Sequence, residues 1–133
     1  MRVVATVSLA LAFGILALAA PVRAHHSFAA QYDAEKVVAL MGKVTKVEWM
    51  NPHVYFYIDV MAADGAVTPW ALEIGGGPNS LIRQGWTRDL LKIDDMVNVE
   101  GWLARDGTHL ANARSVILAS SGKKLFSGTN PGN

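Results

Sequence analysis

The chain has 133 residues, of which 51% are hydrophobic, and its 12 Lys and Arg residues nearly balance its 11 Asp and Glu residues. It contains no cysteine, which excludes disulfide bonds and lipid attachment through an N-terminal cysteine. The only cluster of basic residues after the N-terminal segment is Lys123-Lys124, so the chain lacks the positive surface typical of nucleic-acid-binding proteins, and we expect no nucleic-acid partner.

The first 24 residues have the composition of a secretory signal peptide. Arg2 precedes an uninterrupted apolar run at 3–20, and the segment 21–24 ends in a small residue that suits cleavage. We therefore predict export to the periplasm, with residues 1–24 removed and no membrane span after cleavage. The alternative is an uncleaved membrane anchor, because the apolar run falls within the lower range for a spanning helix.

Cleavage after Ala24 leaves 109 residues, enough for one small domain with a single core. The removed segment holds two of the 12 basic residues and none of the 11 acidic ones, so the mature chain carries a net charge of about −1. We expect an N-terminal lead-in at 25–36, one β domain at 37–120 and a flexible tail at 121–133.

Alternation of apolar and polar residues predicts that the domain is all-β. The segment from His53 to Met61 shows it most clearly, with Phe56 and Ile58 facing inward and Tyr55 and Tyr57 on the other face. In segment 37–49 the inward parity changes between residues 44 and 47, which indicates a bulge. The predicted strands are 37–49, 53–61, 67–74, 96–104 and 113–118.

A glycine-rich linker and a short helix at 81–84 separate the third and fourth predicted strands. Three strands, one helix and two more strands, with a long bent first strand, match the five-stranded Greek-key barrel called the OB-fold. A meander barrel or a sandwich of similar strand count is the alternative. The position of the helix favours the OB-fold-like barrel.

Several stretches of the chain resemble a family of small exported proteobacterial proteins that is catalogued as a domain of unknown function. They are the mature start HHSF with Tyr32-Asp33, then GKVTKVEWMNPH, RQGWTRDLL and EGWLARDGTHLAN. The resemblance covers nearly all of the mature chain and implies no established activity. The layout is also similar to that of periplasmic OB-fold proteins, which are generally ligand-binding or stress-response modules.

The predicted mature N-terminus is a candidate metal site. Cleavage after Ala24 frees an α-amine on His25, and the amine and imidazole of this residue form a chelate that suits Cu(II). His26 adds a second imidazole, and His53 is the predicted third partner of a brace-like site. The alternative is that the two terminal histidines are solvated and that His53 belongs to a structural turn. His109 lies in a loop and is not expected to be a ligand.

The outward aromatic residues are a candidate stacking surface for a small ligand or a protein. The predicted ligand-binding residues are Trp49, Asn51, Tyr55, Tyr57 and Trp102. By contrast, parity places Trp70 in the core, and Trp86 is expected to plug the barrel near the helix.

The sequence contains no motif that defines an enzyme. Glu48, Glu73 and Glu100 lie in three different predicted strands, and no spacing singles out a general acid–base pair. We therefore predict a periplasmic binding or accessory module of unknown ligand, with copper as the first metal to test at His25, His26 and His53. The alternative is an interaction module that docks an envelope protein through its aromatic face without a metal.

Overall fold

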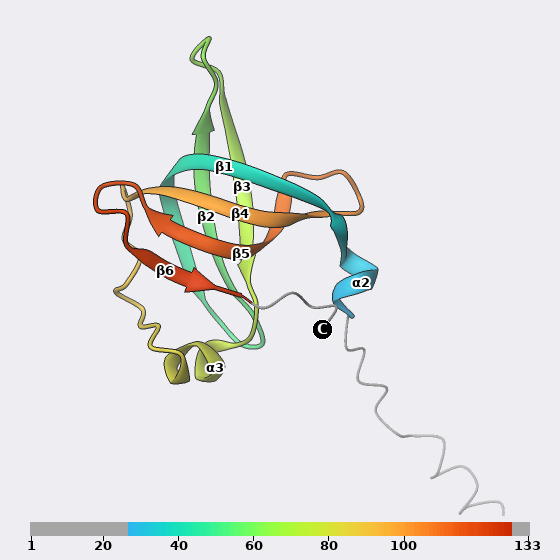
Figure 1. The fold of residues 1–133 in the computed structure, drawn as a ribbon, viewed down its shortest axis with the longest axis vertical. Helices are drawn as coiled ribbons and strands as arrows, with labels where there is room; N and C mark the ends of the chain where they lie inside the picture. The colour runs from blue at the N-terminus through green and yellow to red at the C-terminus, as the bar shows by residue number, and fades with distance from the viewer. Residues whose placement is uncertain (1–26, 129–133) are drawn as a thin grey trace, which may run out of the picture.

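The computed structural model describes residues 27–128, so the predicted signal peptide, His25 and His26 lie outside the described residues. Figure 1 shows a strongly curved sheet with a short helix at each of two ends. The elements in chain order are α2 (Phe28–Gln31), β1 (Tyr32–Trp49), β2 (Val54–Met61), β3 (Val67–Ile74), α3 (Pro78–Arg83), β4 (Met96–Ala104), β5 (Leu110–Leu118) and β6 (Lys124–Ser127).

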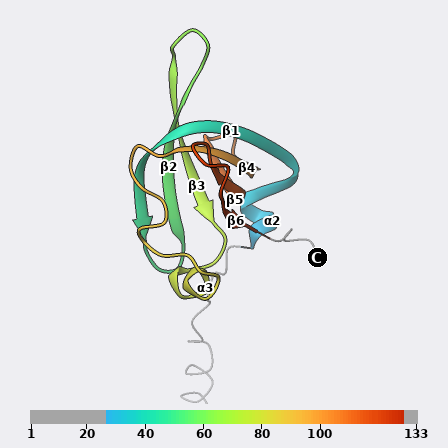
Figure 2. The same ribbon diagram turned by 60° about the vertical axis from the view of Figure 1, so that its left-hand side comes forward.

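The strand order confirms the predicted OB-fold barrel. The sheet runs β3-β2-β1-β4-β5-β6, and a parallel pairing of β3 with β5 closes the first five strands into a barrel. Residues 71–74 of β3 lie beside residues 110–113 of β5. The predicted helix lies between β3 and β4 as α3, at the end of the barrel opposite the long β2–β3 hairpin (Figure 2). These pairings and the helix position define the OB-fold.

Alternating residues of β2 build the core. Val54, Phe56 and Ile58 are completely buried, and the intervening tyrosines lie on the other face. The predicted bulge in β1 is confirmed, because the register between β1 and β2 shifts between Val44 and Lys46. Trp86 is buried against Phe126 at 5.9 Å between ring centroids, as expected for a plug.

Trp70 departs from its prediction, because it is only partly buried. It packs against the edge of the core, and its ring lies 4.9 Å from the ring of exposed His109. The pair lies where β3 leaves the barrel and continues into the hairpin arm, so one side of the indole has no core residues to meet.

Two elements were not predicted from the sequence. The segment expected to be a lead-in contains α2 and the first five residues of β1, and the segment expected to be a tail contains β6. Tyr32 explains the first difference, because its ring is buried with Trp102 and Ala104 in a small second cluster outside the main core. Leu125 and Phe126 explain the second, since both are buried against the main core.

The β2–β3 hairpin extends beyond the barrel as an arm (Figure 1). Pairing between β1 and β2 begins at Asp59, whereas β2 and β3 pair as far as Met61 and Val67. A turn at Asp64-Gly65 closes the arm, and Gly65 has a φ of 85°, which glycine adopts without a steric penalty. Side chains at the tip are therefore exposed to solvent.

A candidate ligand-binding cleft

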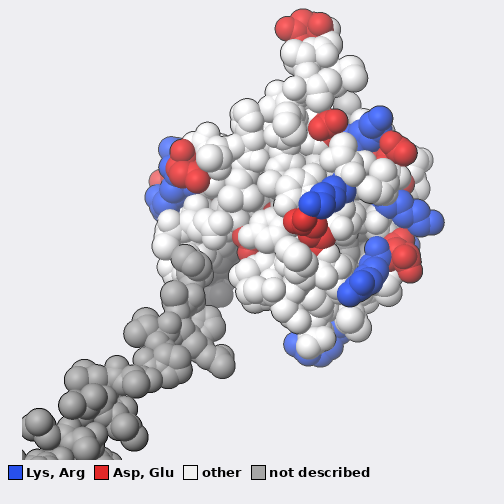
Figure 3. Space-filling model, turned by 180° about the vertical axis from the view of Figure 1, so that it is seen from behind, with Lys and Arg blue, Asp and Glu red and all other residues white. Residues whose placement is uncertain are grey.

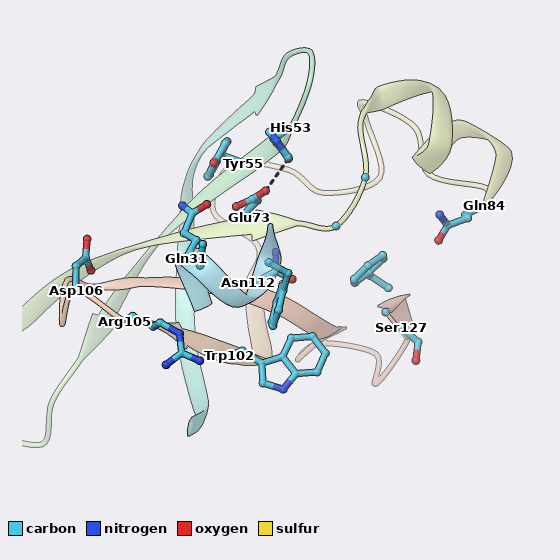
Figure 4. Close-up of a pocket in the computed structure, with 17 residues that line it drawn as sticks. Gln31, His53, Tyr55, Glu73, Gln84, Trp102, Arg105, Asp106, Asn112 and Ser127 are labelled. Carbon is cyan, nitrogen blue, oxygen red and sulfur yellow. Dashed lines mark ion pairs between the residues drawn. The ribbon is translucent and has the colours of Figure 1, made fainter. Parts of the chain in front are cut away.

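A cleft with a volume of about 1120 Å³ opens between α2 and the barrel. Strands β2 to β5 supply its floor, and α2 and β6 supply part of its walls. Figure 4 shows polar side chains from these separate elements pointing into one space. Its polar lining residues include Gln31, His53, Tyr55, Glu73, Arg105 and Asn112.

Glu73 is the central group of the cleft. Its side chain lies on β3 and the residue is only 4% exposed, which is unusual for a carboxylate. Nδ1 of His53 lies 2.6 Å from Oε1 of Glu73, the contact drawn as a dashed line in Figure 4. The hydroxyl of Tyr32 donates a hydrogen bond to Oε2. Both carboxylate oxygens are thus held, one by a residue of β1 and the other by the residue that precedes β2.

The geometry fixes which nitrogen of His53 is free. A carboxylate only accepts hydrogen bonds, so Nδ1 carries the proton that it donates to Glu73. In the neutral form of the ring, Nε2 therefore carries the free lone pair. The His53 side chain is 46% exposed at the edge of the cleft. His53 is therefore an oriented imidazole whose basic nitrogen is open to a ligand.

The two tyrosines beside Glu73 remain protonated well above neutral pH. Burial and the hydrogen bond to Glu73 raise the pKa of Tyr32 far above its ordinary value. Burial, followed by the negative charge of Glu73, raises the pKa of Tyr55 to about 12. Both phenols are therefore hydrogen-bond donors toward the carboxylate at physiological pH.

Arg105 fixes α2 against the barrel. Its Nε donates hydrogen bonds to the backbone oxygens of Ala29 at 2.8 Å and Tyr32 at 3.1 Å. Its Nη1 lies 3.7 Å from Asp33. Phe28 lies across the cleft wall, with its ring 5.3 Å from Tyr32 and 5.4 Å from Trp102. The N-terminal segment of the domain is therefore part of the site.

Only part of the predicted aromatic surface is assembled. Tyr55 lines the cleft beside His53, but Trp102 is 4% exposed, with its ring covered by Phe28. Trp49 packs against the main core, and Tyr57 donates a hydrogen bond to Glu48 at 2.7 Å. The N-terminal segment covers Trp102 and the core partly covers Trp49, so the four aromatic residues do not form one continuous exposed surface.

The remaining predicted residues have different outcomes. Asn51 is exposed in the turn before β2, where the Asn51–Pro52 peptide is cis. His53 is the one predicted metal ligand within the described residues; His25 and His26 lie outside them. Between residues 27 and 128, no three His, Asp or Glu side chains gather in a metal-binding group.

Sequence reasoning missed Tyr32, Glu73 and Asn112 as members of this site. A signal was available for Glu73, because it shares the outward parity of β3 and pairs directly with Tyr55 across β2 and β3. Asn112, which is 8% exposed, lies opposite Glu73 in the β3–β5 pairing. No local sequence pattern indicates that α2 and Tyr32 cover this face and bury the carboxylate.

The fold and the cleft define a small OB-fold domain with a side pocket built around a buried carboxylate. The chain belongs to the family of unknown function DUF6152, whose model matches residues 12–113. This confirms the resemblance to a domain of unknown function that the sequence motifs indicated. Among curated proteins, none matches the sequence of this chain.

Similar solved structures include a single-stranded DNA binding protein and the N-terminal domain of PriB. The mitochondrial single-stranded DNA binding protein Rim1 of S. cerevisiae is 12% identical with a TM-score of 0.49, and the match covers 63% of this chain and 93% of Rim1. The N-terminal domain of PriB from Thermoanaerobacter tencongensis is 19% identical with a TM-score of 0.45, covering 64% of this chain and 97% of that domain. In the part of the chain from 27 to 128, no helix has the length and apolar character to cross a membrane.

Proposed function

We propose that this protein is an exported periplasmic binding module that holds copper at the edge of the cleft, through His53 and a mature N-terminus at His25. The observation that carries the proposal is the contact between Nδ1 of His53 and the buried carboxylate of Glu73, at 2.6 Å. It leaves Nε2 as the free nitrogen of a half-exposed ring.

This arrangement is the one that metal-binding histidines usually have. A ligating imidazole commonly donates its second ring N–H to a carboxylate, which fixes the tautomer, orients the ring and increases its basicity. Glu73 is in turn held by a hydrogen bond from Tyr32, so the carboxylate that orients His53 is itself fixed in place. The imidazole needs little rearrangement to accept a metal ion.

The path of the chain supports a contribution from the N-terminus. Phe28 lines the cleft together with His53, and His25 lies three positions before Phe28 in the sequence. Three residues of extended chain span about 10 Å. After cleavage behind Ala24, the chain length alone would allow the new α-amine and the His25 imidazole to reach the cleft.

Copper is the metal favoured by these donors. Cu(II) prefers nitrogen ligands in a tetragonal plane, and an amine with two imidazoles supplies three of the four positions. The amine and imidazoles must lose protons to bind, so affinity is expected to fall as the pH drops below neutral.

A nucleic-acid function is not part of the proposal. Basic and acidic side chains are interspersed over the face seen in Figure 3. Several basic residues pair with acids: Lys43 with Asp94, Lys46 with Glu48 and Arg114 with Glu100. This face lacks the continuous positive stripe that tracks a phosphate backbone.

The experiment uses protein exported and cleaved in a bacterial periplasm, with mass spectrometry to verify that His25 is residue one. Cu(II) is titrated and EPR spectra are recorded for this protein, for a version with one extra N-terminal residue and for His53→Ala. His109→Ala is the matched control, because His109 is an exposed histidine that stacks on Trp70 away from the cleft.

We expect tight binding with nitrogen hyperfine structure in the mature protein and in His109→Ala, and its loss in the other two variants. Loss in the extended version alone would reduce the site to a terminal chelate without His53. Weak binding that is indifferent to both changes would refute the copper proposal.

A further inference from the structure

The cleft contains a buried negative charge that no Lys or Arg neutralises. Among the described residues, the only ion-pair partner of Glu73 is His53, and no Lys or Arg lies within ion-pair distance of the carboxylate. The second carboxylate oxygen accepts a hydrogen bond from Tyr32, a neutral phenol. Burying a carboxylate without a cation is costly, so the site favours a positively charged group from outside.

Arg105, the one Lys or Arg among the residues that line the cleft, is already engaged. Arg105 lines the cleft, but its guanidinium holds the backbone oxygens of Ala29 and Tyr32 and faces Asp33. Asp106 also lines the cleft and adds a second negative charge near its rim. The acidic side chains that line the cleft, Glu73 and Asp106, therefore outnumber its one Lys or Arg. This excess of carboxylates favours a cation.

The walls around this charge are aromatic. Phe28, Tyr55, Trp102 and Phe126 line the cleft together with Glu73. Aromatic faces attract cations, and the attraction increases when the cation is desolvated. A volume of about 1120 Å³ accommodates an organic molecule rather than only a single ion.

We infer that the cleft binds an organic cation, with an ammonium or amidinium group directed at Glu73 and an apolar body against Phe28 and Phe126. This inference goes beyond the copper proposal and does not depend on it. It needs neither a free N-terminus nor a metal ion, and every residue that it uses lies within the described part of the chain.

The test compares three probes of similar shape and different charge: benzylammonium, benzyl alcohol and benzoate. Each is titrated into the mature protein with EDTA present, so copper has no influence, and amide chemical shifts are followed by NMR. Because the Glu73 charge attracts only a cation, we expect benzylammonium to bind at least about tenfold more tightly than benzyl alcohol. We expect benzoate to leave the resonances of the cleft unchanged.

Three variants separate the charge from the hydrogen-bond network. Glu73→Gln keeps the shape of the side chain and should bind benzylammonium no better than benzyl alcohol. Tyr32→Phe keeps the charge, so it should retain the preference for the cation. Glu100→Gln is the matched control, since it removes an exposed carboxylate that pairs with Arg114, and it should change neither affinity.

The result for the unaltered protein is decisive by itself, whether or not Glu73→Gln folds. Equal affinity for benzylammonium and benzyl alcohol, or no binding of either probe, would overturn the inference. Retention of the cation preference in a folded Glu73→Gln variant would do the same. A negative Cu(II) titration would leave this inference standing, because the two experiments share no ligand.

Discussion

Tyr32→Phe removes one hydroxyl from the centre of the cleft and leaves the ring in place. Tyr32 is 2% exposed, and its hydroxyl donates to a carboxylate that is itself buried. Hydrogen bonds to charged groups contribute roughly 1.5–3 kcal/mol, and the acceptor left behind has little access to replacement water. We therefore expect the free energy of unfolding to fall by about 2 kcal/mol.

The effect is large enough to measure by two methods. For a domain of this size, a loss of about 2 kcal/mol lowers the midpoint of thermal unfolding by roughly 8–16 °C. Urea denaturation followed by tryptophan fluorescence should show a lower midpoint with an unchanged slope, because the surface exposed on unfolding is nearly the same.

Tyr57→Phe is the matched control. It also removes a hydroxyl that donates to a glutamate, but the contact with Glu48 lies on the partly exposed face of β2. Water can replace that bond, so the change in stability should be much smaller. If both variants lose the same stability, or if Tyr32→Phe loses none, the buried network does not hold the cleft together as described.

Three other predictions follow from the same structure. Gly101→Ala should lower the free energy of unfolding by about 1–3 kcal/mol in urea denaturation, because an added Cβ would lie 2.7 Å from a backbone oxygen of β5. Gly75→Ala, which meets no atom within 4 Å, should change it little, and equal effects would contradict the packing argument. The pKa of Tyr55 is raised from 10.0 to about 12 in the folded protein. Its contribution to the free energy of unfolding is therefore complete below pH 10 and is lost as the pH rises toward 12. Tyr55→Phe should therefore reduce the decline in stability over this range, and an unchanged pH profile would exclude the assigned cause. Arg105→Ala should speed amide hydrogen exchange in α2 while the barrel core stays protected, since it removes two hydrogen bonds to the segment; unchanged exchange would show that Phe28 alone holds it.

The barrel could be predicted from the sequence because its signals are local. The strands 67–74 and 96–104 have the predicted bounds, since a half-buried strand repeats every two residues. The helix between these strands begins at Pro78, before the predicted start at residue 81. Proline opens the helix here, and no side chain caps its first turn to mark the start in the sequence. The start of β1 could not be predicted, because the four residues after Tyr32 are not buried and show no alternation of apolar and polar side chains.

The site could be predicted only in part because burial of Glu73 is a long-range effect. His53 and Tyr55 stood out through their outward parity and their place after the Asn51–Pro52 turn. Glu73 and Asn112 become neighbours only when β3 pairs with β5, and Tyr32 covers them from the far end of β1. No short window of sequence contains that arrangement, so the sequence alone does not distinguish Glu73 from Glu48 and Glu100.

The parallel pairing of β3 with β5 closes the barrel, and Glu73 and Asn112 face each other across this seam. Contacts between distant parts of a chain close slowly, so we expect the seam to form late in folding and the cleft to be missing from partly folded forms. A molecule that binds the cleft would then bind the native state alone, and by mass action it would stabilise the protein against unfolding. An increase in the thermal unfolding midpoint therefore offers a way to screen compounds, organic cations first, for the natural ligand of the cleft.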